Sequence, residues 1–322
     1  MSKFVQPVVV VSKCLGFDSC RWNGVTVSNE FVDSLKPFVH FITVCPEVEI
    51  GLGVPRKPVR IVKGNEKNRL YQPDTGRDIT DEMESFVNSF LDSLDEVDGF
   101  ILKYKSPSCG MYGVKLYSEN GNSPAGKTRG FFGREIIERF SNYPIEDEGR
   151  LRNFTIREHF LTTLFNRASF REVKKSGKMK ELVRFHADSK LLFMAYNQKR
   201  LKTLGRICAN PDKKPFPEVI KEYEENLTEV FQRAPRYTSN INVLMHALGY
   251  FSKNLNPEER AFFLEALDNY RDNRVPLSVP SGVIRSWIVR FKEDYLADQT
   301  FFEPYPLELV EITDSGKGRK LK

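Results

Sequence analysis

Three short apolar runs, each followed closely by a cysteine, constrain the fold of this chain more than any other feature of its sequence. The runs lie at residues 8–11, 38–44 and 99–102, and the cysteines that follow them are Cys14, Cys45 and Cys109. Short apolar runs rich in β-branched residues are typical of buried strands in a parallel sheet. Because the carboxyl ends of parallel strands meet at one edge, we expect the three thiols to converge there.

The segments between these runs predict helices and connections that complete an α/β domain. Residues 28–37 and 78–95 carry apolar side chains at helical spacing, and each segment precedes one of the predicted strands. The rest of this half predicts an edge hairpin of residues 59–62 and 70–73, a strand at 114–117, a flexible basic loop at 126–130, a helix at 131–140 and a linker at 142–149.

From residue 151 onward the patterns are those of amphipathic helices. Helices are predicted over residues 157–175, 178–196, 217–234, 239–255, 257–271 and 281–296. The fold class is therefore α/β, a mainly parallel sheet with flanking helices, followed by an all-α helical domain. We place the domains at residues 1–145 and 150–316, with a basic tail at 317–322.

The charge distribution and the cysteine content indicate which kind of partner the chain binds and which cellular compartment it occupies. Residues 151–322 hold 30 Lys and Arg against 22 Asp and Glu, whereas residues 1–150 hold 19 against 21. The basic surplus favours a polyanion as the partner of the second half. Five cysteines, without a hydrophobic signal segment or an apolar span of about twenty residues, are typical of a cytoplasmic protein with reduced thiols and no membrane contact.

Clustered cysteines in that compartment indicate metal binding or catalysis more often than disulfides. Three thiols are one fewer than a closed zinc site or an ordinary iron–sulfur cluster uses, so one coordination position would stay open. Spacing does not separate iron from zinc, and three unrelated buried thiols are the simpler alternative. Cys20 and Cys208 follow no strand and are interpreted as core or surface thiols, although Cys20 is near enough to Cys14 to be a redox neighbour.

The sequence around the three cysteines resembles the TudS-type thiouracil desulfidases over roughly residues 5–145. The segments that carry this resemblance are Ser12-Lys-Cys14-Leu-Gly with Arg21-Trp-Asn-Gly24, Cys45-Pro-Glu47, and Leu102-Lys103-Tyr-Lys-Ser106-Pro-Ser-Cys109-Gly110. Two departures are Trp22, where a tyrosine is more usual, and the extra thiol of Cys20.

This resemblance implies a [4Fe-4S] cluster held by Cys14, Cys45 and Cys109, with an open iron that takes the thiocarbonyl sulfur of the substrate. It also implies catalytic roles for Glu47, which would assist water attack or proton transfer, and for Ser106. As substrate-binding residues we predict Ser12, Arg21, Lys103 and Ser108. Without the resemblance, Glu47 is a surface or N-cap carboxylate and Ser106 a turn-stabilising hydroxyl.

The second half resembles the YbgA-type helical domain in Phe185-His186-Ala-Asp-Ser-Lys190, Asn242-Val-Leu-Met-His246 and Gln299-Thr-Phe-Phe-Glu-Pro-Tyr-Pro306. A fusion of these two domains is similar to the RudS-type desulfidases, which implies conversion of 4-thiouridine in tRNA to uridine with release of sulfide. The densest basic region predicts tRNA contacts at Lys190, Lys199, Arg200, Lys202 and Arg206. Free thiouracil and thiouridine nucleotides are further candidate substrates, and no obligate protein partner is implied.

Two functions of other classes compete with this interpretation. A zinc hydrolase would use the same three cysteines and a metal-bound water. A non-catalytic RNA-binding protein would carry a structural metal whose fourth position is filled by a side chain.

Overall fold

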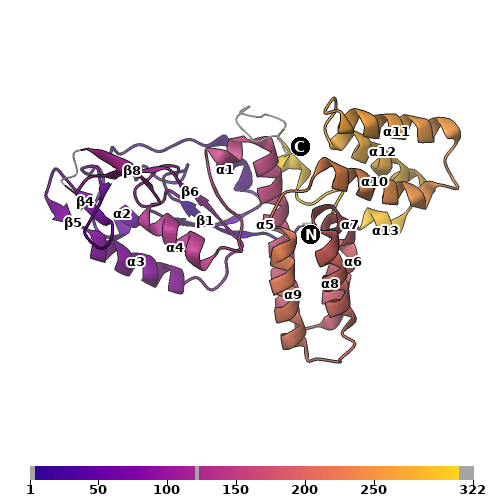
Figure 1. The fold of residues 1–322 in the computed structure, drawn as a ribbon, viewed down its shortest axis with the longest axis horizontal. Coiled ribbons are helices and arrows are strands. Elements are labelled where there is room, and N and C mark those ends of the chain that lie inside the picture. The colour runs from indigo at the N-terminus through magenta and orange to yellow at the C-terminus, as the bar shows by residue number, and fades with distance from the viewer. Residues whose placement is uncertain (1–3, 120–122, 312–322) are drawn as a thin grey trace. The chain divides into compact units, whose positions relative to one another are not determined.

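The computed structural model describes residues 4–119 and 123–311 and divides into two compact units (Figure 1). The first unit contains the described residues up to Ala168 together with residues 308–311, and the second spans Ser169–Leu307. The domain limits drawn from the sequence stay a prediction. The predicted basic tail at 317–322 lies outside the described residues.

A four-stranded, fully parallel sheet is the centre of the first unit. Its strand order is β2-β1-β6-β9. The strands are β1 (Val8–Ser12), β2 (His40–Val44), β6 (Gly99–Leu102) and β9 (Ile145–Asp147). This topology confirms the predicted fold class and places the ends of the three cysteine-bearing strands side by side.

The prediction of a plain linker at 142–149 is wrong, because β9 lies within it. Ile145 pairs with Phe100 of β6, and the two residues after Ile145 are acidic. An edge strand forms through its backbone hydrogen bonds, so these side chains give no apolar pattern that would reveal it.

A second sheet of five strands, ordered β5-β4-β3-β7-β8, corrects two further predictions. Its strands are β3 (Arg60–Val62), β4 (Arg69–Gln72), β5 (Arg77–Asp78), β7 (Val114–Tyr117) and β8 (Pro124–Thr128). The predicted hairpin exists, but β3 and β4 are inner strands of this sheet, between β5 and β7, and not an edge hairpin. The predicted basic loop is largely β8, whose exposed residues pair antiparallel with β7.

Helices cover both faces of the parallel sheet. The helices of this unit are α1 (Glu30–Leu35), α2 (Pro46–Glu49), α3 (Thr80–Asp92), α4 (Phe131–Arg139), the 3-10 turn η1 (Arg150–Arg152) and the first part of α5 (Phe154–Ser176). Helices α3 and α4 run side by side (Figure 1) and pack on the face that carries Val10 and Phe100. On the other face, Leu164 of α5 approaches Gly99, where a Cβ atom would lie 2.9 Å from it.

The second unit is helical throughout residues 169–307, as predicted. Besides the end of α5, its helices are α6 (Met179–Asp188), α7 (Lys190–Tyr196), α8 (Gln198–Ala209), α9 (Phe216–Val230), α10 (Tyr237–Phe251), α11 (Pro257–Arg271), α12 (Ser278–Phe291) and α13 (Asp294–Ala297); the 3-10 turn η2 (Leu307–Leu309) follows. Fully buried aromatic residues such as Phe193, Tyr223 and Phe251 form its core. Across the described part of the chain, no helix has the length and apolar character needed to cross a membrane.

The predicted single helix over 178–196 is wrong, because it breaks at Ser189 into α6 and α7. The Gln299 side chain accepts a hydrogen bond from Leu191 N–H at 3.0 Å and donates one to the Ala187 carbonyl at 2.8 Å. These bonds satisfy backbone groups that the break would otherwise leave unpaired. Helix α8 was not predicted. The predicted helix over 281–296 is in fact α12 and α13, which are separate because the backbone of Lys292 between them is left-handed (φ 51°).

Candidate active site

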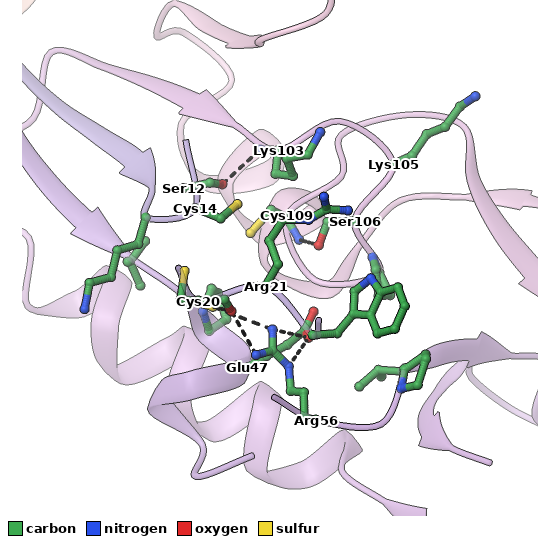
Figure 2. Close-up of a pocket in the computed structure, with 18 of the residues that line it drawn as sticks. Ser12, Cys14, Cys20, Arg21, Glu47, Arg56, Lys103, Lys105, Ser106 and Cys109 are labelled. Carbon is green, nitrogen blue, oxygen red and sulfur yellow. Dashed lines mark hydrogen bonds and ion pairs between the residues drawn. The ribbon is translucent and has the colours of Figure 1, made fainter. Parts of the chain in front are cut away.

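A pocket of about 320 Å³ opens at the carboxyl edge of the parallel sheet (Figure 2). The loops that follow β1, β2 and β6 line it and contribute Cys14, Cys45 and Cys109, as the strand-end spacing predicted. A fourth thiol, Cys20, lies in the same lining and is only 2 % exposed. The structure therefore places four of the five cysteines in one pocket.

Local backbone geometry fixes the first two predicted thiols. Cys14 lies two residues past the end of β1, and the neighbouring Lys13 N–H donates to the Val44 carbonyl at 2.8 Å, which joins this loop to the end of β2. Cys45 follows Val44 directly and is the N-cap residue of α2, whose first turn begins with Pro46. Neighbouring parallel strands thus deliver both sulfur atoms to the same edge.

The loop that carries Cys109 is held in place by the hydroxyl group of Ser106, which belongs to the same loop, and by helix α4. The Ser106 hydroxyl oxygen accepts hydrogen bonds from Ser108 N–H at 3.2 Å and Cys109 N–H at 3.1 Å. At the start of α4, Gly133 N–H donates to the Ser108 carbonyl at 3.1 Å, and a Cβ on Gly130 would lie 2.4 Å from that oxygen. The helix terminus can approach this loop so closely because glycine has no side chain there.

Burial and hydrogen bonds, some of them between the thiols themselves, raise the pKa values of three of the pocket cysteines. Burial raises the pKa of Cys109 to about 12, while the hydroxyls of Ser12 and Ser106 oppose that rise through hydrogen bonds. A hydrogen bond with Cys14 raises the pKa of Cys20 to about 11, and a hydrogen bond with Cys20, together with burial, raises the pKa of Cys45 far above its ordinary value. Cys20 is thus part of the thiol cluster, which agrees with the alternative that it neighbours Cys14 and not with its interpretation as a separate core or surface thiol.

Glu47 lies in this pocket and is bound by two donors. Ser108 Oγ donates to Glu47 Oε1 at 2.6 Å, and Arg56 Nε donates to Oε2 at 2.8 Å. Both side chains of the ion pair are buried, with Arg56 4 % and Glu47 10 % exposed. Arg56 was not among the predicted site residues, because it lies within the glycine- and proline-rich residues 51–60, which contain no motif that points to the cysteines.

A second buried carboxylate, Glu148, lies beside the pocket-lining Lys103. Lys103 Nζ forms an ion pair with Glu148 Oε1, and Glu148 Oε2 accepts a hydrogen bond from Tyr104 N–H at 2.7 Å. The backbone N–H of Lys103 donates to Ser12 Oγ at 2.9 Å. Glu148 was not among the predicted site residues, because it comes from the segment predicted to be a linker, which β9 brings next to β6.

The other predicted pocket residues differ in their access to the pocket. Ser12, Arg21, Lys103 and Ser106 line it. Ser108 is 1 % exposed and outside that lining, behind Glu47. Its hydroxyl therefore contacts the Glu47 carboxylate directly.

The predicted nucleic-acid contacts fall on two helices of the second unit. Lys190 begins α7, and Lys199, Lys202 and Arg206 are exposed along α8 at spacings of three and four residues, which puts them on one helix face. Arg200 is half-buried, pairs with Glu229 and donates to Asn226 at 3.1 Å. It therefore joins α8 to α9, and its charge is already compensated.

The donor set of the pocket fits an iron–sulfur cluster, because such clusters are bound through cysteine thiolates. Three thiols from three loops surround the pocket, and its lining includes the cations Arg21, Arg56 and Lys103. Arg56 and Lys103 form ion pairs with Glu47 and Glu148. Within residues 4–119 and 123–311, no three His, Cys, Asp or Glu side chains are arranged as the ligands of a single metal ion.

Comparison with protein families gives one match for each half of the chain. Residues 9–148 match the family described as 2-thiouracil desulfurase, and residues 190–306 match a family described as a protein of unknown function, DUF1722. The first match includes every predicted pocket residue, and the second includes the exposed cations of α8.

Individual relatives fall into the same two groups. The chain is 31 % identical over 110 residues to the uncharacterized protein YbbK of Bacillus subtilis (strain 168), which covers 32 % of this chain and 73 % of YbbK. It is 26 % identical over 136 residues to the uncharacterized protein YbgA of Escherichia coli (strain K12), covering 42 % of this chain and 80 % of YbgA. A solved structure titled [4Fe-4S]-dependent thiouracil desulfidase TudS is 24 % identical, with a TM-score of 0.36, and the match covers 45 % of this chain and 93 % of that one.

Proposed function

Through residues 9–148 this chain belongs to the 2-thiouracil desulfurase family, and on that premise we propose that it is a desulfidase that replaces the thiocarbonyl sulfur of a thiolated pyrimidine with oxygen. The observation that carries the proposal is the convergence of Cys14, Cys45 and Cys109 in one pocket beside the buried carboxylate of Glu47. Overall, the reaction consumes water and releases sulfide without net oxidation or reduction.

As cofactor we propose a [4Fe-4S] cluster held by Cys14, Cys45 and Cys109. When bound, such a cluster with one open iron supplies a soft Lewis acid that prefers sulfur to oxygen. The thiols must lose their protons when they become ligands, so loading releases protons from the pocket.

Glu47 is the proposed general base. It is two residues from Cys45, and its carboxylate is oriented by Arg56 and Ser108. In this role it accepts a proton from the attacking water or relays one to the departing sulfur. Ser108 acts through Glu47, because its hydroxyl is buried against the carboxylate.

Around the substrate we propose three direct contacts and one supporting residue. The Ser106 oxygen already accepts two backbone N–H bonds, so its own proton can be donated to the pyrimidine or to the sulfur. Arg21 and Lys103 supply cationic donors in the pocket lining. Ser12 holds the backbone of Lys103 in place, because the Ser12 hydroxyl oxygen accepts a hydrogen bond from the Lys103 N–H.

The proposed substrate is 4-thiouridine in tRNA. The exposed cations Lys199, Lys202 and Arg206 on α8 form a stripe that can neutralise backbone phosphates. A stacked nucleotide must leave its stack to enter a pocket. The family description also favours free 2-thiouracil as a second candidate substrate.

The test is anaerobic reconstitution with iron and sulfide, followed by incubation with tRNA containing 4-thiouridine and, separately, with 2-thiouracil. We expect iron-dependent loss of thiocarbonyl absorbance and release of sulfide, abolished by Cys109→Ala and preserved in Cys208→Ala, which removes the buried thiol of the second unit. Equal rates in the Cys109→Ala variant and the wild type would contradict the proposal. So would a loaded cluster that leaves both substrates intact.

A further inference from the structure

Arg56 makes more polar contacts in the pocket than any role as a simple counter-ion requires. Its Nε donates to Glu47 Oε2 at 2.8 Å, and Nη2 lies 2.8 Å from the same oxygen. Nη1 donates to the carbonyls of Cys20 at 2.8 Å and Gly53 at 3.1 Å. Nη2 also donates to Cys45 Sγ at 3.9 Å. All three guanidinium nitrogens are therefore engaged.

These contacts join separate segments of the chain. Glu47 and Cys45 belong to the start of α2, and Cys20 belongs to the loop after β1. The Arg56 backbone N–H adds a hydrogen bond to the Trp22 carbonyl at 2.8 Å. One buried side chain thus fixes the loop after β1 relative to the residues that follow β2.

The two oxygens of Glu47 have different partners. Arg56 contacts Oε2, while Ser108 donates to Oε1. Donors on both oxygens prevent rotation of the carboxylate and fix its plane in the pocket. A base must keep its orientation to be effective, because small displacements of reacting groups reduce rates strongly.

Arg56 also contacts the sulfur atom of Cys45, one of the three proposed cluster ligands. A guanidinium N–H directed at a ligand thiolate stabilises negative charge on that sulfur. Hydrogen bonds to ligand sulfurs are among the factors that set the reduction potential of an iron–sulfur cluster. The same side chain therefore reaches both the proposed base and a proposed cluster ligand.

We propose that Arg56 is a positioning residue that couples the orientation of Glu47 to the electronic environment of Cys45. This inference rests on the proposed function for the Glu47 part, whereas the Cys45 part requires only that the cluster is bound. Lysine cannot replace arginine fully, because it offers one ammonium group in place of a planar fork.

The experiment compares Arg56→Met and Arg56→Lys with wild type, each reconstituted anaerobically. The matched control is Arg60→Met, which removes a cation from the same stretch of chain, where Arg60 lies over the ring of Tyr117. For turnover of 4-thiouridine tRNA we expect kcat to fall about 10–100-fold in Arg56→Met, with KM nearly unchanged and with partial recovery in Arg56→Lys. The cluster reduction potential should become more negative in Arg56→Met and stay unchanged in Arg60→Met.

A double-mutant cycle separates positioning from general destabilisation. If Arg56 acts mainly through Glu47, adding Arg56→Met to Glu47→Gln should lower kcat by a much smaller factor than Arg56→Met does in the wild type. Independent, additive losses would overturn that part of the inference, and an unchanged potential in folded, loaded Arg56→Met would overturn the other. Wild-type protein that loads the cluster but turns over no thiolated substrate would contradict the proposed function instead, while the potentials would still test the Cys45 contact.

Discussion

The carboxylate of Glu47 has donors on both oxygens and is almost fully removed from solvent. A surface or N-cap carboxylate, the simpler interpretation of its sequence position, would have neither property. The ion pair with Arg56 provides the compensation that a buried carboxylate requires. This environment supports a role in proton transfer for Glu47, and Ser106 on the opposite loop completes the polar side of the pocket.

Substitution of Glu47 by glutamine tests that role directly. We expect Glu47→Gln to lower kcat by about 10²–10⁴-fold, the usual contribution of a positioned acid or base, while iron content and visible absorption stay at wild-type levels. Glu49→Gln is the matched control, because Glu49 lies on the same short helix but is exposed. Turnover near the wild-type rate in Glu47→Gln would exclude Glu47 as the base.

The fourth thiol allows a test of how many cysteines hold the cluster. Cys20 contacts Cys14 and Cys45, yet the proposed ligand set does not include it. We expect Cys20→Ser to keep its iron and to retain activity within a few-fold of wild type. Iron loss as severe as in Cys45→Ser would show that Cys20 is a ligand.

Sequence patterns predict the site residues that directly follow strands, and they do not reveal the site residues that reach the pocket only through tertiary contacts. Cys14, Cys45 and Cys109 are recognisable because each follows an apolar run, whereas Glu47 was singled out only through the family resemblance of the Cys45-Pro-Glu47 segment. Arg56 and Glu148 reach the pocket through tertiary contacts. No local spacing connects them to the cysteines, so sequence patterns could not place them.

Elements with weak or misleading patterns explain the errors in the predicted fold. The strand β6 is buried along its length and β1 is buried from Val9 onward, so both are evident from hydropathy. The edge strand β9 forms through backbone pairing, and the break between α6 and α7 depends on Gln299, which is more than a hundred residues away. Both features require information that no local window contains.

The exposed cations of helix α8 are predicted to bind tRNA. Reversing Lys199, Lys202 and Arg206 to glutamate should weaken tRNA binding and reduce the slope of log K against log salt by about 2 or more, since each phosphate contact contributes about 0.7–0.9. The measurement is a salt series of binding titrations. The same reversal at Lys253, Arg271 and Arg274, exposed cations away from α8, should have a smaller effect. Equal effects of the two triple variants would place the tRNA surface elsewhere.

His186 in helix α6 is expected to make the stability of the protein depend on pH. Burial lowers the pKa of His186 to about 4 from 6.5, and its Nδ1 lies 3.0 Å from the Tyr223 hydroxyl. Between these values the unfolded chain binds the proton and the folded chain does not, so stability falls as the pH decreases from about 6.5 to 4. Thermal unfolding should therefore occur at a lower temperature at about pH 5 than near neutrality.

His186→Gln is the variant for this measurement, because it removes the titration and keeps a polar partner for Tyr223. It should flatten part of the pH dependence of the melting temperature. His159, whose pKa burial also lowers to about 4, should account for a remaining part. An unchanged slope in His186→Gln would contradict the assignment.

For the whole molecule, the two units divide the proposed task. The first contains the thiol pocket, and the second contains most of the basic surplus and the α8 cations. Sequence patterns predicted this division into α/β and all-α halves, because hydrophobic periodicity changes from strand-like to helical along the chain. The substrate is the part of the account that neither periodicity nor charge determines.

The most direct test of the central claim is incubation of the reconstituted protein with 4-thiouridine tRNA in water labelled with a heavy oxygen isotope, with no added reductant. We predict that mass spectrometry will find the heavy oxygen in the uridine product, with one sulfide released for each uridine formed. Unlabelled uridine, or conversion that requires an external electron donor, would contradict hydrolytic desulfuration in this pocket.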